Sequence, residues 1–307
     1  VPTLDKKGLA AVTSSFFAAL CASVSKADVV HIHAEGPSFM CWLPKLFGKK
    51  VIVTVHGLDW QREKWKRGFG AKYIRMGERM AVRFADEIIV LSRNVQDYFA
   101  QTYGRKTVWI PNGVTRPEIA EADRITSQYG LKKDGYILFL GRLVPEKGIH
   151  YLIDAYNCIE TDKKLVIAGD TSDTDEYVKM IKQKASGNPD IIFTGFISGD
   201  VLCEIYSNAY VVTLPSDIEG MSLSLLEALA YGNAVLCSDI PENTLVTENK
   251  AMHFKKSNVE DLAEKLQSMC DDEEIVNNLK NGVGEFILNK YNRNDVANAT
   301  YELYKKI

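Results

Sequence analysis

Two glutamates stand eight residues apart where a strand-like run gives way to a helical pattern. Glu219 and Gly220 fall in the loop, and Glu227 falls about one turn inside the helix expected over Ser222–Tyr231. A helix start binds anions through its free N–H groups and its positive dipole end, and Gly220 lets a ligand approach the backbone closely. Glu219 and Glu227 could then hydrogen-bond hydroxyl groups of the same ligand. A simpler alternative is a capping box at Ser224–Glu227, in which Glu227 only satisfies backbone N–H groups.

Two cations five residues apart follow another strand-like run. The run Tyr136–Leu140 ends in Gly141, after which Arg142 and Lys147 flank a proline turn and a helix follows. Two fixed cations at the carboxyl end of a strand can neutralise a diphosphate. The alternative is a surface turn whose cations are solvated. The spacing matches no Walker loop, and no G-x-G-x-x-G follows a strand, so P-loop and dinucleotide chemistry have little support.

Histidines supply a third group of candidates. His56 ends a buried strand at the edge where parallel sheets bind ligands, and we interpret it as a functional residue. His31 and His33 alternate along another strand end, so we expect His31 in the core and leave the role of His33 open. His150 and His253 are interpreted as structural, and no spacing indicates a metal site.

Basic and aromatic residues are interleaved over Trp60–Arg83. We assign the beginning of this segment, with Trp60, Arg62, Lys64 and Trp65, to the acceptor or membrane side. Such a mixture suits an anionic membrane surface or a lipid diphosphate. It suits equally well the stacking of single-stranded nucleic acid, or a solvated helix face with core anchors.

Charge is unevenly distributed along the chain. The 307 residues have a formal net charge of −3, but residues 1–116 hold 18 Lys and Arg against 9 Asp and Glu. Residues 117–307 hold 19 Lys and Arg against 31 Asp and Glu. The basic part favours contact with a polyanion or membrane, and the acidic part argues against a protein that coats nucleic acid. Six well-separated cysteines without a C-x-x-C predict a reducing, cytoplasmic setting with neither disulfides nor structural zinc.

Short Val- and Ile-rich runs alternate with helical patterns and must position these residues. The alternation predicts an α/β protein with two Rossmann-like, doubly wound parallel sheets facing a ligand cleft. The strands are expected at Asp28–His33, Val51–Val55, Glu87–Leu91, Val108–Ile110, Tyr136–Leu140, Leu165–Ala168, Ile191–Thr194, Tyr210–Leu214, Ala234–Ser238 and Met252–Phe254. Turn residues and the change of charge divide the chain into domains over 1–116 and 117–290, with a C-terminal helix over 291–307 packing back towards the first.

The segment 6–27 begins with two lysines and continues with a largely apolar stretch. It could be a signal peptide, but its Thr and Ser residues and the strand that follows favour an amphipathic core helix. No run of 18 or more uninterrupted apolar residues predicts a transmembrane span.

The motifs resemble, in order and spacing, those of family-4 retaining glycosyltransferases of the GT-B fold. In the first part the resemblance rests on Asp28–His33, Thr54–Gly57, Ala85-Asp86 and Ile110–Val114. In the second part it rests on Gly141-Arg142, Lys147-Gly148, Ile167–Asp170 and Glu219-x7-Glu227. The stretch Gly57–Trp65 also looks like transferases of bacterial surface-polysaccharide assembly, including some rhamnosyltransferases. The family normally opens with a strand and a Gly-rich loop that this chain lacks before Asp28, so we expect a truncated first domain and leave the activity of this chain open.

The resemblance implies roles for single residues. The donor phosphates would be bound at Gly141, Arg142, Lys147, Gly220, Met221 and Ser222. Glu227 would bind the ribose, Glu219 the transferred sugar, and His56 would lie near the reacting side of that sugar. The loop with Phe196 and Ile197 would lie near the base.

The activity implied by the resemblance is that of a metal-independent hexosyltransferase without a cofactor. It would move a sugar from a UDP-, dTDP- or GDP-linked donor to a glycan or lipid-linked acceptor, in contact with the anionic inner face of the plasma membrane. No nucleic acid partner is expected. A non-catalytic nucleotide-sugar-binding module and a GT-B sugar-nucleotide epimerase remain as alternatives, the second disfavoured by Glu219-x7-Glu227. The nucleotide, sugar, acceptor, linkage and oligomeric state are left open.

Overall fold

The computed structural model describes residues 3, 9–62, 69–171 and 174–307. The chain divides into two compact units: unit 1 is Val1–Asn112 with Asn294–Ile307, and unit 2 is Gly113–Arg293. The division after Asn112 lies four residues before the predicted boundary at residue 116. The C-terminal segment Asn294–Ile307 belongs to unit 1.

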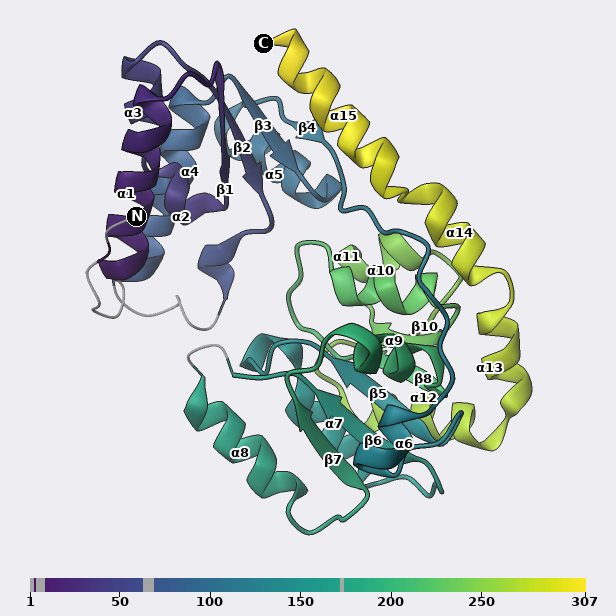
Figure 1. Ribbon diagram of the computed structural model, residues 1–307. Helices are drawn as coiled ribbons and strands as arrows, with labels where there is room; N and C mark the ends of the chain where they lie inside the picture. The colour runs from purple at the N-terminus through teal and green to yellow at the C-terminus, as the bar shows by residue number, and fades with distance from the viewer. Residues whose placement is uncertain (1–2, 4–8, 63–68, 172–173) are drawn as a thin grey trace. The chain divides into compact units, whose positions relative to one another are not determined.

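Unit 1 contains a parallel sheet in the order β1-β2-β3-β4 (Figure 1). Its strands are β1 (Val29–His33), β2 (Lys50–Val55), β3 (Glu87–Val90) and β4 (Val108–Trp109). Its helices are α1 (Leu9–Val24), α2 (Glu35–Ser38), α3 (Trp42–Leu46), the 3-10 helix η1 (Asp59–Gln61), α4 (Phe69–Phe84), α5 (Arg93–Tyr103) and α15 (Arg293–Lys306). Each strand lies within a residue or so of its predicted position.

The side chains of β2 are buried on both faces of this sheet. Val51, Val53 and Val55 pack in one core cluster with residues of α4 and α5, whereas Ile52 packs in a second cluster with Leu303 of α15. Successive side chains of a strand point to opposite faces. A continuous Val and Ile run is therefore stable only where both faces are covered, here by α4 and α5 on one side and α15 on the other.

Unit 2 contains a six-stranded parallel sheet in the order β10-β9-β8-β5-β6-β7 (Figure 1). Its strands are β5 (Tyr136–Leu140), β6 (Lys164–Ala168), β7 (Ile191–Gly195), β8 (Val211–Leu214), β9 (Ala234–Ser238) and β10 (Met252–Phe254). Its helices are α6 (Arg124–Tyr129), the 3-10 helix η3 (Pro145–Lys147), α7 (Ile149–Tyr156), α8 (Asp175–Ala185), α9 (Gly199–Ser207), α10 (Leu223–Ala230), α11 (Pro241–Thr247), α12 (Val259–Asp271), α13 (Glu273–Lys280) and α14 (Val283–Lys290). The predicted α/β class with two doubly wound parallel sheets is confirmed.

The strand order of unit 2 reverses between β5 and β8. The chain runs outward from β5 through β6 to β7, and it then returns to place β8 on the other side of β5. In open parallel sheets, ligands bind outside the carboxyl ends of the strands at such a reversal. The loops that leave these two strand ends are 141–148 and 215–222, which are the two segments singled out by their charges and glycines.

Two further properties concern the described part of the chain. None of its helices combines the length and the apolar composition that a bilayer crossing would need. Its cysteines form no disulfide, and it holds no cluster of three or more His, Cys, Asp or Glu side chains that could bind a metal ion.

Candidate functional site

The two loops at the strand reversal are held against each other. The N–H of Asp217 donates to the carbonyl oxygen of Glu146 at 2.8 Å. Gly148 has a φ of +67°, and a Cβ atom at this position would lie 2.0 Å from the carbonyl oxygen of Pro215. Only glycine tolerates both the left-handed backbone and this approach. The loop with the predicted cations therefore lies directly on the loop with the first predicted glutamate.

An ion pair joins two of the predicted site residues. Lys147 Nζ lies 2.5 Å from Glu219 Oε1, and the two side chains are only 13% and 9% exposed. Salt screens a pair at this burial much less than it screens a surface pair. Arg142, by contrast, is exposed and forms no ion pair within the described ranges. Arg142 thus offers a positive charge without an ionic partner in the described part of the chain, whereas the charge of Lys147 is balanced by Glu219.

The amino-terminal end of α10 follows this loop. Its N-cap is Ser222, whose Oγ accepts a hydrogen bond from the N–H of Leu225 at 3.4 Å. The N–H groups of Gly220 and Ser222 donate to no residue that the structure describes. They lie at the positive end of the helix dipole, where an anion is stabilised. The alternative capping box at Ser224–Glu227 is wrong, because the helix is capped two residues earlier.

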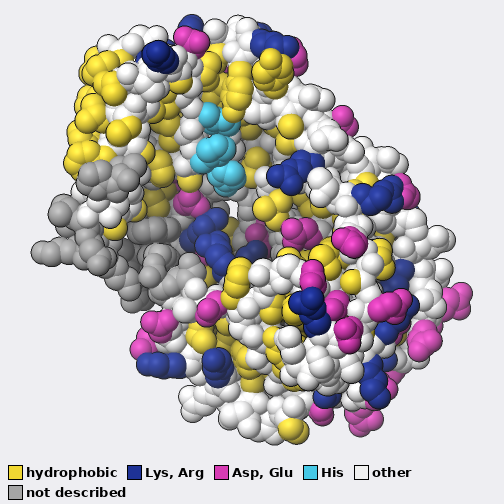
Figure 2. Space-filling model, in the orientation of Figure 1, with side chains coloured by type: hydrophobic (Ala, Val, Ile, Leu, Met, Phe, Trp, Pro, Cys, Tyr) yellow, Lys and Arg dark blue, Asp and Glu magenta, His cyan; other side chains and the backbone are white. Residues whose placement is uncertain are grey.

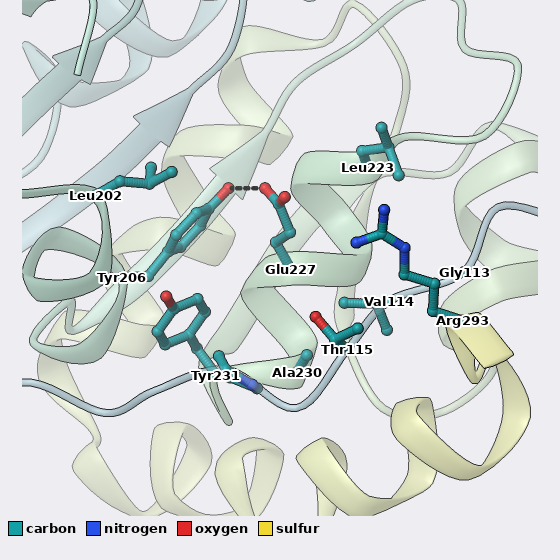
Figure 3. Close-up of a pocket in the computed structure, with 11 residues that line it drawn as sticks. Gly113, Val114, Thr115, Leu202, Tyr206, Leu223, Glu227, Ala230, Tyr231 and Arg293 are labelled. Carbon is teal, nitrogen blue, oxygen red and sulfur yellow. Dashed lines mark hydrogen bonds between the residues drawn. The ribbon is translucent and has the colours of Figure 1, made fainter. Parts of the chain in front are cut away.

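Glu227 lines a pocket of about 360 Å³ within unit 2 (Figure 3). Its Oε2 accepts a hydrogen bond from Tyr206 Oη at 3.3 Å, and the Tyr231 ring stacks on the Tyr206 ring with centroids 5.0 Å apart. Burial raises the pKa of Glu227, and the hydrogen bond from Tyr206 partly offsets that effect. The pocket is lined by Gly113, Val114, Thr115, Pro117, Leu202, Tyr206, Leu223, Glu227, Ala230, Tyr231 and Arg293.

Only Glu227 among these lining residues was identified from the sequence. Tyr206 comes from α9 and Tyr231 directly follows α10, whereas Thr115 and Arg293 come from the segments where the chain enters and leaves unit 2. Figure 3 shows the Arg293 side chain extending towards α10. These residues lie far apart in the sequence and share no motif, so no local signal could have found them.

The loop after β7 does not contribute to this pocket. Gly195 turns the chain with a φ of +71°, and the Phe196 side chain is 76% exposed. Ile197 is partly buried. That Phe196 and Ile197 lie near a base remains a prediction.

Three histidines of unit 1 form a row of contacts. His31 lies 2.7 Å from Thr54 Oγ1 through Nε2 and 2.6 Å from Tyr304 Oη through Nδ1. The His31 and His33 rings stack at 4.3 Å, and His33 Nδ1 lies 3.2 Å from His56 Nε2. Burial, aided by the two neighbouring imidazoles, lowers the pKa of His31 to about 4, and burial also lowers the pKa of His33 and His56. His33 is exposed, whereas His31 and His56 are partly buried. Histidine side chains gather on the face shown in Figure 2.

Two of the four predicted acceptor-side residues lie in the described part of the chain, and both are partly buried. Trp60 is partly buried, and its Nε1–H donates to Glu78 Oε2 at 3.2 Å. Arg62 is partly buried and forms an ion pair of 3.2 Å with the aspartate three residues before it. Lys64 and Trp65 lie outside the described residues.

The helix α4 carries most of the remaining cations of the basic segment. Its exposed side holds a stripe of four cations, with the buried Ile74 and Ala81 on the opposite side. This cationic stripe consists of Lys72, Arg75, Arg79 and Arg83. The Arg75 guanidinium lies over the Trp60 ring at 4.2 Å. The segment is therefore an amphipathic helix with core anchors and an exposed, charged side.

Family models match most of the chain. Residues 121–284 match the model described as glycosyl transferases group 1, and residues 2–116 match the model described as glycosyltransferase family 4. The chain belongs to the family-4 glycosyltransferases. The resemblance to family-4 glycosyltransferases drawn from the motifs is thereby confirmed.

Relatives of this glycosyltransferase carry out several different transfers. An uncharacterized glycosyltransferase of Methanocaldococcus jannaschii is 28% identical, with 92% of this chain and 76% of that protein covered. The alpha-maltose-1-phosphate synthase of Mycolicibacterium smegmatis is 25% identical, with 100% and 86% covered. An O-antigen chain mannosyltransferase of Salmonella typhimurium is 27% identical, with 59% and 50% covered.

Solved structures support the same fold. A sucrose-phosphate synthase from Thermosynechococcus elongatus matches with a TM-score of 0.81 at 22% identity, covering 94% of this glycosyltransferase and 76% of that chain. Anabaena HepE, solved in complex with UDP-glucose, matches with a TM-score of 0.84 at 17% identity, covering 97% and 82%. At these identities the likeness concerns the GT-B fold alone.

Proposed function

We propose that this glycosyltransferase moves a sugar, with retention of anomeric configuration, from a nucleotide-diphosphate sugar to a glycan or lipid-linked acceptor of the bacterial surface. The observation that carries the proposal is the ion pair between Lys147 and Glu219, held beside the start of α10 at the strand reversal. It places a cation, a carboxylate and a helix start in one small region. These are the groups that a diphosphate joined to a hydroxyl-rich sugar requires.

The phosphates would be bound by fixed positive groups. Arg142, Lys147 and the N–H groups of Gly220 and Ser222 would stabilise the charge that builds on the diphosphate as the bond to the anomeric carbon breaks. Because these groups together supply positive charge to the diphosphate, we propose that they replace a divalent metal. Glu219, released from Lys147 when the donor binds, would accept hydrogen bonds from the transferred sugar.

The nucleoside would occupy the pocket of Glu227. The Glu227 carboxylate, oriented by Tyr206, would accept hydrogen bonds from the two ribose hydroxyls. The volume of about 360 Å³ lies at the small end of the range for ligand pockets and suits a nucleoside. The complex of HepE with UDP-glucose, in the same fold, supports a nucleotide sugar as the donor.

The acceptor would be part of a surface glycan. The O-antigen chain mannosyltransferase among the relatives supports this class, as does the resemblance of Gly57–Trp65 to transferases of surface-polysaccharide assembly. We assign His56 to the reacting side of the sugar, where a neutral imidazole can donate or accept a hydrogen bond. The cationic stripe of α4 would meet anionic lipid at the inner face of the membrane.

A panel of nucleotide sugars tests the proposal. UDP, dTDP and GDP are first titrated into the protein by calorimetry, and we expect saturable binding of one of them that weakens at least about ten-fold in Arg142→Ala and in Lys147→Ala. The products formed from the matching nucleotide sugars are then followed in the presence and absence of EDTA. Transfer that is unaffected by EDTA supports the proposal. Binding without turnover supports a non-catalytic module, an epimerised nucleotide sugar supports an epimerase, and absent or variant-insensitive binding contradicts the donor site.

A further inference from the structure

Unit 1 contains two buried glutamates that have no role in the proposed transfer. Glu35 is the first residue of α2 and Glu78 lies in α4, and both are 0% exposed. The carboxyl group of Glu78 lies beside that of Glu35, and Glu35 Oε1 is buried without a hydrogen-bond partner among the described residues. Burying a carboxyl group costs folding free energy unless hydrogen bonds compensate for the lost water. The hydrogen-bond partners of the two glutamates therefore indicate what the pair does.

The pair is bonded to the loop that follows His56. Glu35 Oε2 accepts a hydrogen bond from the N–H of Asp59 at 2.8 Å. Glu78 Oε2 accepts one from Trp60 Nε1–H at 3.2 Å. Asp59 and Trp60 form the start of η1, three and four residues after His56. Both carboxyl groups therefore hold the same short loop.

Hydrogen bonds from three side chains converge on Glu78. Its Oε1 accepts from Tyr98 Oη at 2.9 Å and also from Tyr103 Oη, and its Oε2 accepts from Trp60 Nε1–H. These three donors use most of the acceptor sites of a carboxyl group. A proton on Glu35 Oε1, a buried oxygen without another partner among the described residues, would let Glu35 donate to Glu78 as well. Burial, followed by the contact with Glu78, raises the pKa of Glu35 to about 10.

The backbone holds the pair rigidly in place. A Cβ atom on Gly77 would lie 1.9 Å from the Glu35 carbonyl oxygen, so α2 and α4 touch through their backbones at this point. Ala34, between His33 and Glu35, has a φ of +73°, which is a strained conformation for a residue with a side chain. The strain turns the chain at the end of β1 and directs Glu35 into the interior.

We propose that Glu35 and Glu78 are positioning residues. By binding the N–H of Asp59 and the indole of Trp60 they clamp the loop 57–61 and thereby set the orientation of His56. The inference rests on the proposed function, because it takes His56 to act at the reacting sugar. The clamp involves only residues of unit 1, whereas the donor is assigned to unit 2. Loss of the clamp should consequently lower kcat and leave the KM of the donor almost unchanged.

Glutamine and leucine substitutions test the clamp in the full chain. Glu35→Gln retains a donor towards Glu78 and an acceptor for Asp59, so kcat should stay within about three-fold of wild type. Glu35→Leu removes the bond to Asp59 and the contact with Glu78. Glu78→Gln replaces a carboxyl group that accepts from three side chains by an amide with two N–H donors of its own. Each of these two should lower kcat at least about ten-fold with a donor KM changed less than about two-fold. Asp97→Asn, the same chemical change at an exposed site on α5, serves as control.

A readout without turnover separates this inference from the proposed function. In ¹⁵N spectra of the full chain, recorded well below each unfolding temperature, the Trp60 indole N–H and the His56 ring signals should move in Glu35→Leu and Glu78→Gln and stay near wild type in Glu35→Gln. The clamp is overturned if Glu35→Gln and Glu35→Leu change kcat and the spectra equally. It is also overturned if the Glu35→Leu and Glu78→Gln variants are less stable but keep the wild-type signals and kcat. If Glu78→Gln does not fold, the two Glu35 variants decide. If wild type turns over no nucleotide sugar, the proposed function fails and the spectra still decide the clamp.

Discussion

Lys147 Nζ and Glu219 Oε1 lie 2.5 Å apart, although the two residues are separated by 72 positions in the sequence. The contact exists because Gly148 lets its loop lie against the carbonyl group of Pro215. As a consequence, the cation assigned to the donor phosphate already has a carboxylate partner. We expect a phosphate that approaches Lys147 to compete with the negative charge of Glu219 beside it, and this competition makes the pair a testable feature of the site.

Glu219→Gln should separate binding from turnover. Removing the negative charge releases Lys147, so the nucleoside diphosphate without its sugar should bind as well as in wild type or up to about ten-fold more tightly. Sugar transfer should fall at least about 100-fold, because Glu219 is assigned to the transferred sugar. Calorimetry and product analysis measure the two effects, with Glu227→Gln as the variant that should weaken diphosphate binding. Equal loss of affinity in both variants would show that Glu219 does not compete for Lys147.

Gly148→Ala should destabilise unit 2 and disturb its site. The new Cβ would lie 2.0 Å from the Pro215 carbonyl oxygen, and the backbone φ of +67° disfavours alanine. We expect a loss of at least about 2 kcal/mol, which corresponds to a decrease of about 4–8 °C in Tm. Gly187→Ala is the matched control, since a Cβ there has nothing within 4 Å. Similar unfolding temperatures for the two variants in calorimetry would contradict the close packing of the loops.

His31 should make the stability of unit 1 depend on pH. Its pKa is about 4 in the folded protein, below the ordinary 6.5, so the unfolded chain binds this proton more readily. The stabilising contribution is therefore complete above about pH 6.5 and is lost as the pH falls towards about 4. His31→Gln should unfold at a lower temperature than wild type at pH 7.5 but lose less further stability by pH 4.5. Parallel decreases in Tm for the two proteins would refute this role.

The cationic stripe of α4 should bind anionic membranes. We expect vesicles with anionic lipid to sediment the protein, whereas vesicles of neutral lipid should not, and the binding should weaken as salt is raised. The double variant Arg79→Glu and Arg83→Glu should reduce binding at least about ten-fold. The double variant Lys26→Glu and Lys106→Glu, which changes two exposed cations elsewhere in unit 1, controls for net charge. Unaltered sedimentation of the α4 double variant would remove α4 from the contact.

Much of the local structure follows directly from the sequence. The Val- and Ile-rich runs identify every strand of both sheets to within a residue or so, because a strand buried on both faces must be apolar throughout. The charged and glycine-containing loops after β5 and β8 can also be predicted from the sequence. Their candidate functional groups lie close to a strand end in the sequence, so the spacing between residues is enough to identify them. These loops are 141–148 and the segment from Glu219 to Glu227.

The tertiary structure decides which distant residues meet. Whether Ser222 or Ser224 caps α10 depends on where the chain leaves β8. Because Ser222 is the cap, Glu227 is not part of a capping box, and its side chain accepts a hydrogen bond from Tyr206. The Glu227 pocket and the pairing of Glu35 with Glu78 likewise combine groups from separate elements, which no periodic pattern relates. Local interactions are encoded in neighbouring residues, so the sequence by itself determines the strands, the helices and the motif loops. Pair contacts and the protonation of buried groups depend on packing and desolvation, which only the folded chain establishes.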